Sequence, residues 1–140
     1  MTESYTLQER LPTLEEYRAL CTSVGWEDFM NFDVAQTSLD RSVFGVVVVR
    51  DGEAVGMGRI VGDGAIYFYI QDIAVHPAHQ KQGLGTRLMG ALMAYLQTHA
   101  PEKAFVGLFA AEGTQPFYRH YAFDAYPALT GMFTVINRQG

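Results

Sequence analysis

The sequence predicts one mixed α/β domain that spans residues 1–140. A chain of 140 residues suits one domain and leaves little room for a second. Because 49% of the residues are hydrophobic and only 18% are charged, the chain can form a real core and is far from a disordered composition. The hydrophobic period also changes along the chain from helical to strand-like and back, which indicates both element types.

The N-terminal part is predicted to be helical. Thr13–Glu16, directly after Pro12, is typical of a capping box, in which the first and fourth residues close the start of a helix. Apolar residues then recur at helical spacing until Gly25, which should end the helix. A second, shorter helix is expected to begin at Asp33–Gln36.

Three consecutive antiparallel strands should follow. Val43–Val49 is continuous and mostly β-branched, as in a strand that is covered on both faces. Asp51-Gly52 is a two-residue hairpin signal and leads into Ala54–Val61. A second turn at residues 62–64 then leads into a long strand from Ala65 to about Val75.

The rest of the chain predicts a β-loop-α-β crossover, followed by a C-terminal helix and strand. The glycine-bearing loop Gln80–Gly85 precedes a helix from about Thr86 to His99. We then expect a strand at Lys103–Ala110, a short helix at Gln115–Tyr121 and a closing strand at Gly131–Asn137.

Charge and composition argue against several kinds of partner. The net charge of -5 repels phosphate backbones, so nucleic acid is a poor partner. No apolar run reaches the roughly 18–20 residues that span a bilayer, and the N-terminus lacks the pattern of a signal peptide, so no membrane partner is expected. Since Cys21 is the only cysteine, an internal disulfide is impossible and a cysteine-based zinc site is not expected. We therefore expect no metal and, by default, a cytoplasmic location.

The most informative segment is the loop Gln80–Thr86, between a strand end and a helix start. Gly83 and Gly85 allow backbone dihedrals that other residues avoid and let a ligand approach the main chain. Successive N–H groups in such a turn can converge on one anion, and the next helix adds its unpaired first N–H groups and the positive end of its dipole. The loop therefore predicts a main-chain cradle for phosphate or pyrophosphate.

Two common phosphate-binding motifs do not fit this loop. A P-loop needs Gly-x-x-x-x-Gly-Lys-Ser/Thr, which the sequence lacks. The dinucleotide fingerprint needs a small residue three positions after the second glycine, where this chain has Leu88.

The pattern that remains is Gln/Arg-x-x-Gly-x-Gly/Ala after a strand, here Gln80-Lys81-Gln82-Gly83-Leu84-Gly85 after Ile70–Pro77. A second segment, Pro116–Phe123, is similar to Phe-Tyr-x-x-x-Gly-Phe. With the predicted strand order, these segments resemble the GCN5-related N-acetyltransferase (GNAT) superfamily. Two positions depart from its pattern. Lys81 stands where the family often has glycine, which costs flexibility but adds a cation, and Ala122 replaces the usual glycine before Phe123.

The resemblance implies an acyl-CoA N-acyltransferase fold and acetyl-CoA as cofactor. In the family the central strand separates from its neighbour, and the pantetheine arm pairs with the exposed backbone. The cofactor-binding residues that the resemblance implies come from this strand and the loop: Ile73, Ala74, Val75, Gln80, Lys81, Gln82, Gly83, Leu84, Gly85 and Thr86. The side chains of Ile73 and Val75 are expected to serve the core, so their role concerns the backbone.

Tyr118 is the candidate general acid because of its position in the second motif. A phenol with a pKa of about 10 stays protonated at neutral pH and can protonate the departing thiolate. The alternative is a core tyrosine on a short helix.

Asp72 is the second catalytic candidate, because it is a charged residue within an apolar strand. Strand alternation places it with Phe68, Ile70 and Ala74. Its carboxylate is expected to attract the acceptor ammonium and take its proton. Alternatively, Asp72 caps a turn or pairs with an arginine such as Arg59.

Other residues carry weaker signals. His76 and His79 flank the loop as polar rim, base or turn residues. Cys21 lies on an apolar helical stripe, which favours a buried, inert thiol over a nucleophile. Trp26 and the aromatic run Tyr67–Tyr69 belong to the core or to the acceptor pocket.

Three functions remain open at this stage. The first is acetyl transfer to a primary amine of a small molecule, by direct attack in a ternary complex. The second is acetylation of a protein N-terminus or lysine, and the third is a non-catalytic acyl-CoA-binding module. The resemblance is also compatible with a homodimer.

Overall fold

We describe residues 4–138 of the chain in a computed structural model. They divide into two compact units, one up to Val106 and one from Gly107, and each unit is described by itself.

The first unit holds most of the regular structure. Its elements are β1 (Thr6–Gln8), α1 (Leu14–Ser23), η1 (Glu27–Phe29), η2 (Phe32–Val34), α2 (Ala35–Asp40), β2 (Phe44–Arg50), β3 (Glu53–Gly62), β4 (Tyr67–Val75), η3 (Pro77–His79), α3 (Leu84–His99) and the start of β5 (Phe105–Gly107). The sheet order is β1-β2-β3-β4-β5, and the first four strands pair antiparallel. The three predicted antiparallel strands are therefore confirmed. The short strand β1 was missed, because three residues carry no periodic pattern.

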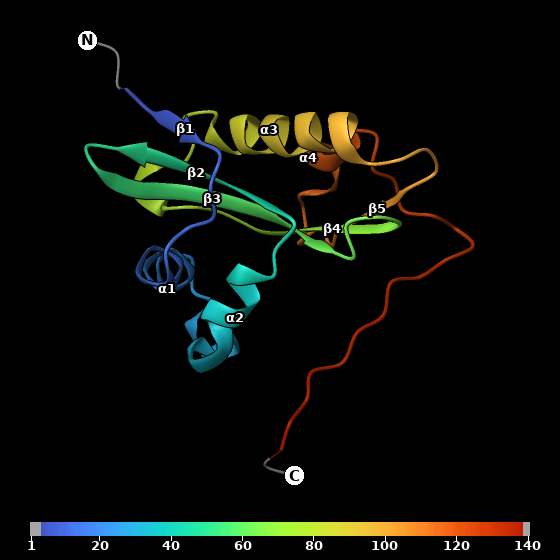
Figure 1. The fold of residues 1–140 in the computed structure, drawn as a ribbon, viewed down its shortest axis with the longest axis horizontal. Helices are drawn as coiled ribbons and strands as arrows, with labels where there is room; N and C mark the ends of the chain where they lie inside the picture. Colours follow the sequence, from blue (N-terminus) through green and yellow to red (C-terminus); the bar gives the residue numbers. More distant parts are fainter. Residues whose placement is uncertain (1–3, 139–140) are drawn as a thin grey trace. The chain divides into compact units, whose positions relative to one another are not determined.

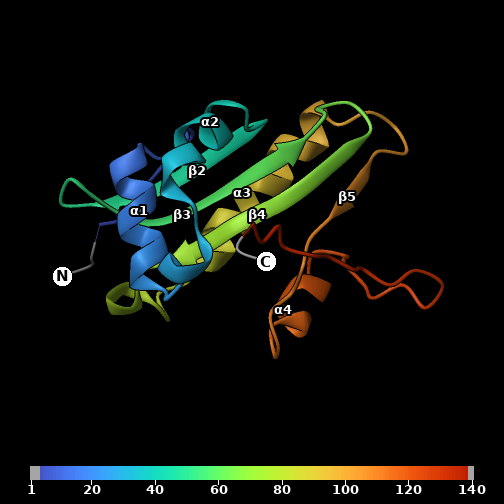
Figure 2. The ribbon, with the colours of Figure 1, turned by 90° about the horizontal axis from the view of Figure 1, so that it is seen from below.

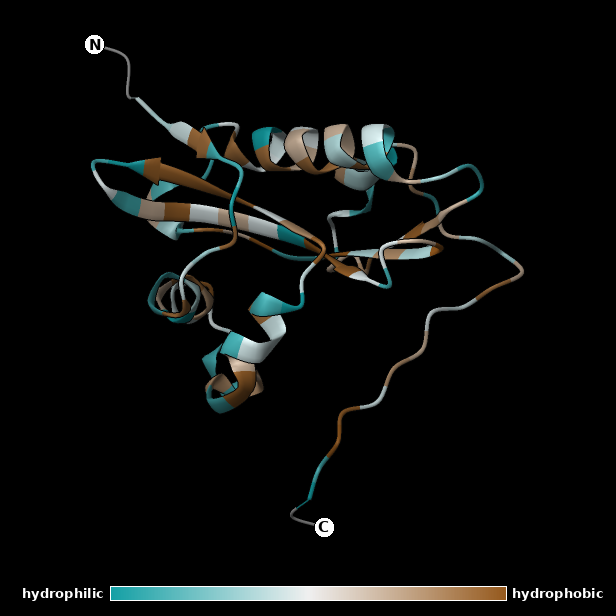
Figure 3. Ribbon diagram, in the orientation of Figure 1, coloured by the Kyte–Doolittle hydropathy of each residue, from teal (hydrophilic) through white to brown (hydrophobic). Residues whose placement is uncertain are grey.

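Helices cover both faces of this sheet (Figure 1). Helix α3 packs on β2, β3 and β4, whereas α1 contacts β3 and β4 from the opposite face (Figure 2). Figure 3 shows hydrophobic residues along β2, while α1 and α3 carry both hydrophobic and hydrophilic residues. Such amphipathic helices bury one stripe each, so two apolar layers enclose the sheet.

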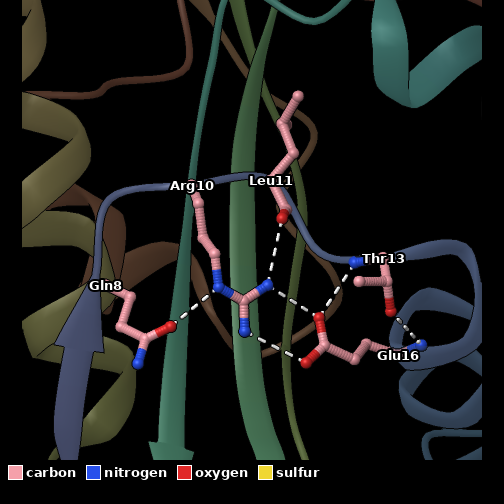
Figure 4. Close-up of polar contacts among 5 residues, drawn as sticks. All are labelled: Gln8, Arg10, Leu11, Thr13 and Glu16. Atoms are coloured by element: carbon pink, nitrogen blue, oxygen red, sulfur yellow. Dashed lines mark hydrogen bonds and ion pairs between the residues drawn. The ribbon is translucent and has the colours of Figure 1, made fainter.

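Helix α1 begins as predicted, with both bonds of the capping box. The Glu16 N–H donates to Thr13 Oγ1 at 3.1 Å, and the Thr13 N–H donates to Glu16 Oε1 at 2.9 Å. The Arg10 guanidinium donates to Glu16 Oε1 at 2.8 Å, to Gln8 Oε1 at 2.7 Å and to the Leu11 carbonyl at 3.2 Å (Figure 4). The pKa of Glu16 is lowered mainly by the Arg10 hydrogen bond. Arg10 thus ties the end of β1 to the first turn of α1.

Strand β4 is interrupted by a β-bulge. Ala74 pairs with Met57 and Gln71 pairs with Arg59, so two residues of β4, Asp72 and Ile73, face the single residue of β3 between those partners. Asp72 adopts a left-handed conformation with φ of 58°.

The bulge changes which side chains share a face. Ala74 pairs with Met57, whereas Ile70 pairs with Ile60, and residues three apart on β3 point to opposite faces. The prediction that Asp72 lies with Phe68 and Ile70 was therefore wrong, because alternation does not continue through an extra residue. The grouping with Ala74 holds.

A buried ion pair secures this bulge. Arg59 Nε donates to Asp72 Oδ2 at 2.7 Å, and the Tyr17 hydroxyl donates to the same oxygen at 2.9 Å. Arg59 Nη1 also donates to the Ser38 carbonyl at 3.2 Å and to Ser42 Oγ at 2.9 Å. Burial, together with the charge of Asp72, raises the pKa of Tyr17, so this hydroxyl remains a donor. One guanidinium thereby connects β3, β4 and α2, and the pairing of Asp72 with Arg59 anticipated as the alternative is confirmed.

The second unit contains the short helix α4 (Gln115–Arg119), which agrees with the predicted helix apart from its end. The predicted strand Lys103–Ala110 is reduced to β5, which begins in the first unit. The predicted closing strand Gly131–Asn137 was wrong, since these residues form no strand within residues 4–138. A strand is stable only where a second strand pairs with its backbone N–H and C=O groups. The residues of one segment do not show which other segment could pair with it.

We expect Arg59→Met to lower the free energy of unfolding by about 3–5 kcal/mol, because it leaves the Asp72 carboxylate buried without its cation. Both side chains are largely buried, with 10% and 15% exposure. Urea denaturation of this variant should be compared with Arg41→Met, which removes an exposed arginine of the same region. Equal losses in the two variants would contradict the proposed importance of the pair.

Candidate functional site

A cavity of about 300 Å³ lies where β4 ends and α3 begins. Its lining residues come from β4, from η3, from the loop before α3 and from the first turn of α3: Ile73, Val75, His79, Gln80, Lys81, Gly83, Leu84 and Gly85. Seven of these were predicted as cofactor-binding residues, and His79 was predicted to flank the loop as a polar rim, base or turn residue. The predicted residues Ala74, Gln82 and Thr86 do not line the cavity.

The loop reaches the helix through two left-handed residues. Lys81 has φ of 64° and Gly83, the N-cap of α3, has φ of 78°. A Cβ on Gly83 would meet nothing within 4 Å, so the glycine is required by its dihedral angle and not by lack of space. The helix begins at Leu84, two residues before the predicted start, and the Arg87 N–H donates to the Gly83 carbonyl at 3.2 Å.

The electrostatics of this corner favour an anion. Helix α3 is 16 residues long and directs the positive end of its dipole toward the loop. Its first turn carries no acidic side chain, and Lys81 and Arg87 lie at the same end. Main-chain N–H groups, a helix dipole and nearby cations together form a site suited to phosphate groups.

Hydrogen bonds fix the connection between strand and loop. Gln80 Nε2 donates to the Val75 carbonyl at 3.0 Å, and the His76 N–H donates to the Val55 carbonyl of β3 at 2.8 Å. In η3 the Ala78 N–H donates to His76 Nδ1 at 3.1 Å. The start of the loop is therefore held against the end of β4.

Both departures from the family pattern fall on left-handed residues. Lys81 has φ of 64° and Ala122 has φ of 72°, at the two places where glycine is usual. A residue with a Cβ pays roughly 1–2 kcal/mol for this conformation. Lys81 therefore adds backbone strain, an effect that the sequence alone did not show.

Asp72 does not line the cavity, although Ile73 next to it does. The bulge turns Asp72 toward α1, where Arg59 and Tyr17 occupy its Oδ2 atom. Since the Arg59 guanidinium balances its charge, Asp72 attracts a second cation less strongly than a lone carboxylate would.

Two other predicted residues have clear surroundings. Cys21 is fully buried in the core between α1 and the sheet, as expected, and desolvation raises the pKa of its thiol to about 11. Trp26 packs against the same core cluster.

Tyr118 lies in α4 of the second unit, half-buried, with its ring 5.1 Å from that of Phe117. Burial raises the pKa of its hydroxyl. The phenol therefore stays protonated at neutral pH, as a general acid requires, and its function at the cavity remains a prediction from the motif.

Two contacts in the first unit could not be predicted from the sequence. The Tyr17 hydroxyl reaches Asp72 only because the bulge turns that carboxylate toward α1. Tyr5, which directly precedes a strand too short to predict, contacts His79, 74 residues away. For the network of Tyr17, Asp72 and Arg59, the only signal in the sequence was that Arg59 and Asp72 lie in neighbouring predicted strands.

No group of three or more histidine, cysteine, aspartate or glutamate side chains within residues 4–138 could hold a metal ion. Over the same range, no helix has the length and apolar character that crossing a bilayer demands.

These features define an α/β domain in which a bulged strand ends beside a cavity at the start of a helix. The sequence matches the Acetyltransferase (GNAT) family over residues 11–123. The chain therefore belongs to this family and is an acyltransferase enzyme, as the motifs predicted.

Named relatives support this assignment. An uncharacterized N-acetyltransferase (ycf52-like) of Prochlorococcus marinus is 32% identical over 124 residues, which cover 86% of this chain and 67% of the relative. A soybean (Glycine max) histone acetyltransferase is 30% identical over 129 residues, covering 84% of this chain and 55% of that protein. The chain thus spans about half to two thirds of these relatives.

Solved structures agree with the fold. A probable acetyltransferase from meticillin-resistant Staphylococcus aureus has a TM-score of 0.86 and 29% identity, covering 95% of this chain and 100% of that one. A GNAT family protein from Streptococcus pneumoniae has a TM-score of 0.77 and 30% identity, covering 96% and 99% of the two chains. These structures confirm the predicted fold class.

Proposed function

We propose that this chain is a single N-acetyltransferase domain, residues 1–140, that transfers the acetyl group of acetyl-CoA to a primary amine of a small molecule. The observation that carries the proposal is the cavity lined by both the bulge of β4 and the glycine loop before α3. Acetyl-CoA, when bound, supplies an activated thioester, and the amine attacks it directly.

The residues around the cavity fit the phosphate groups of coenzyme A. The loop offers main-chain donors beside the left-handed Gly83, no acidic side chain opposes them in the first turn of α3, and Lys81 adds a positive charge. At the other end of the cavity, the bulge opposite Gly58 loosens the pairing of β4 with β3 and is suited to present main-chain groups of Ile73–Val75 to the pantetheine arm. A backbone donor there would stabilise the developing oxyanion by about 3–4 kcal/mol.

We expect Gly83→Asp to abolish coenzyme A binding, because it places a carboxylate in the phosphate cradle and strains the backbone. Calorimetric titration measures this loss. The matched control is Gly52→Asp, which has the same kind of strain at φ of 80° in the β2–β3 hairpin, outside the cavity. The control should bind normally, and micromolar affinity retained by Gly83→Asp would refute the loop assignment.

We assign the role of general acid to Tyr118, which would protonate the thiolate that leaves. Its raised pKa keeps the proton available at neutral pH, but it also makes transfer to a thiolate with a pKa of about 8.5 uphill. The site must therefore assist this step, for example through a hydrogen bond formed as the thiolate departs.

Tyr118→Phe should lower kcat by about 100-fold, since only the donated proton is lost. The Kd for acetyl-CoA should change by less than about twofold, because the hydroxyl serves the leaving group and not the ground state. Tyr126→Phe in the same unit removes an exposed hydroxyl and serves as the control. An unchanged kcat would assign the acid to another group.

For Asp72 we propose an acceptor-side role, in which the carboxylate attracts the amine and receives its proton directly or through water. Its ion pair with Arg59 supports a structural role more directly, so the experiment must separate the two. The distinction is possible because only the acceptor-side role depends on the protonation state of the amine.

Asp72→Asn should reduce the rate most at pH values at which the acceptor is an ammonium ion, which needs a base before it can attack. Initial rates measured across the pH range, with acetylated product counted by mass spectrometry, give this profile. A loss of equal size at every pH, together with a lower unfolding free energy, would identify Asp72 as structural.

The acceptor class is the least constrained part of the proposal. The soybean relative is named a histone acetyltransferase, which favours a protein substrate as the second candidate. Parallel assays with pooled small amines and with lysine-bearing peptides, followed by mass spectrometry, decide between them. Binding of coenzyme A without turnover of either pool would favour a non-catalytic acyl-CoA-binding module. A cytoplasmic location and a homodimer stay predictions, and one relative from Arabidopsis thaliana is named chloroplastic.

A further inference from the structure

The N-terminal strand brings a tyrosine against the loop that lines the cavity. The Tyr5 hydroxyl lies 3.0 Å from His79 Nδ1, and the two rings meet edge to face with centroids 5.7 Å apart. Both side chains are half-buried. Since His79 ends η3 and lines the cavity, Tyr5 contacts a cavity residue directly.

A neighbouring arginine indicates the direction of this hydrogen bond. Arg50 Nη1 lies 3.5 Å from the Tyr5 oxygen, and its guanidinium carbon lies 5.5 Å from the centre of the Tyr5 ring. A guanidinium can only donate, so the long Arg50 contact uses a lone pair of the phenol oxygen. With that lone pair engaged, the hydroxyl hydrogen of Tyr5 is available for donation to His79 Nδ1.

Donation from Tyr5 would select one tautomer of His79. A neutral imidazole whose Nδ1 accepts a hydrogen bond carries its hydrogen on Nε2. In that tautomer, His79 has an N–H donor for a ligand in the cavity that it lines. The same corner holds cations, because Lys81 lines the cavity and Arg87 Nη1 donates to the Tyr5 carbonyl at 3.2 Å.

We propose that His79 contacts the cofactor by donating from Nε2–H to a phosphate oxygen of coenzyme A, and that Tyr5 is the positioning residue that holds this tautomer. The inference rests on the proposed function, since it needs coenzyme A in the cavity. The acceptor oxygen belongs either to the diphosphate or to the 3′-phosphate, and both present the same chemistry to an imidazole N–H. Strand β1, which pairs with β2 and is tied to α1 by Arg10, supplies the rigid support for Tyr5.

The test combines binding with a measurement of the tautomer. Calorimetry at about pH 8, above the usual histidine pKa of about 6.5, gives the Kd for coenzyme A and for 3′-dephospho-coenzyme A. His79→Ala should raise the Kd for coenzyme A about tenfold, and Tyr5→Phe should raise it about threefold, because the donor remains but is no longer held. The control is His99→Ala, at the opposite end of α3, which should bind as the unaltered protein does.

The dephospho cofactor identifies the phosphate. A penalty from His79→Ala that persists with 3′-dephospho-coenzyme A supports contact with the diphosphate, and a penalty that disappears supports contact with the 3′-phosphate. Long-range ¹H–¹⁵N NMR of the unliganded protein should show the Nε2–H tautomer for His79, and Tyr5→Phe should weaken this preference.

Two results would overturn the inference: an unchanged Kd in His79→Ala, or the Nδ1–H tautomer in the unaltered protein. Failure of the proposed function is recognised separately, because the unaltered protein would then bind no coenzyme A at all. The tautomer measurement needs no cofactor, so it tests the Tyr5–His79 pair in either case.

Discussion

The buried pair of Arg59 and Asp72 is the interaction on which the arrangement of the first unit depends. A buried guanidinium is tolerated in a core only where most of its donors are satisfied, and here acceptors on β4, on α2 and at Ser42 satisfy them. The pair holds Asp72 in the left-handed conformation that the bulge requires. Without this anchor, β4 would regain regular pairing with β3 more readily, and the main chain next to the cavity would be less exposed.

The bulge places two adjacent residues of β4 in different environments. Asp72 faces α1 and its polar network, while Ile73 lines the cavity. An uninterrupted strand also alternates its faces, but its backbone groups are taken up by both neighbours. The extra residue frees the main chain locally, which is the property that a binding site for an extended ligand needs. Packing on one face and binding on the other are thus set by the same irregularity.

The sequence predicted the elements whose signals are local. The capping box of α1, the Asp51-Gly52 hairpin and the glycine loop each depend on residues within a few positions of one another. The bulge, the contact of Tyr17 with Asp72 and the contact of Tyr5 with His79 depend on which strand lies beside which, and in what register. Strict alternation therefore grouped Asp72 wrongly with Phe68 and Ile70. The prediction of the closing strand was wrong because the residues of a strand do not specify the strand that pairs with it. Lys81 was recognised as unusual, but its strain became visible only from its backbone angle.

The burial of Cys21 has a practical consequence for studying turnover. It is the only cysteine of the chain, and its sulfur is shielded on all sides by the core between α1 and the sheet. With a thiol pKa near 11, little of it is in the reactive thiolate form at neutral pH. A disulfide dye added to the folded enzyme will therefore react with the thiol of coenzyme A as turnover releases it. The thiol of Cys21 will add almost no colour of its own.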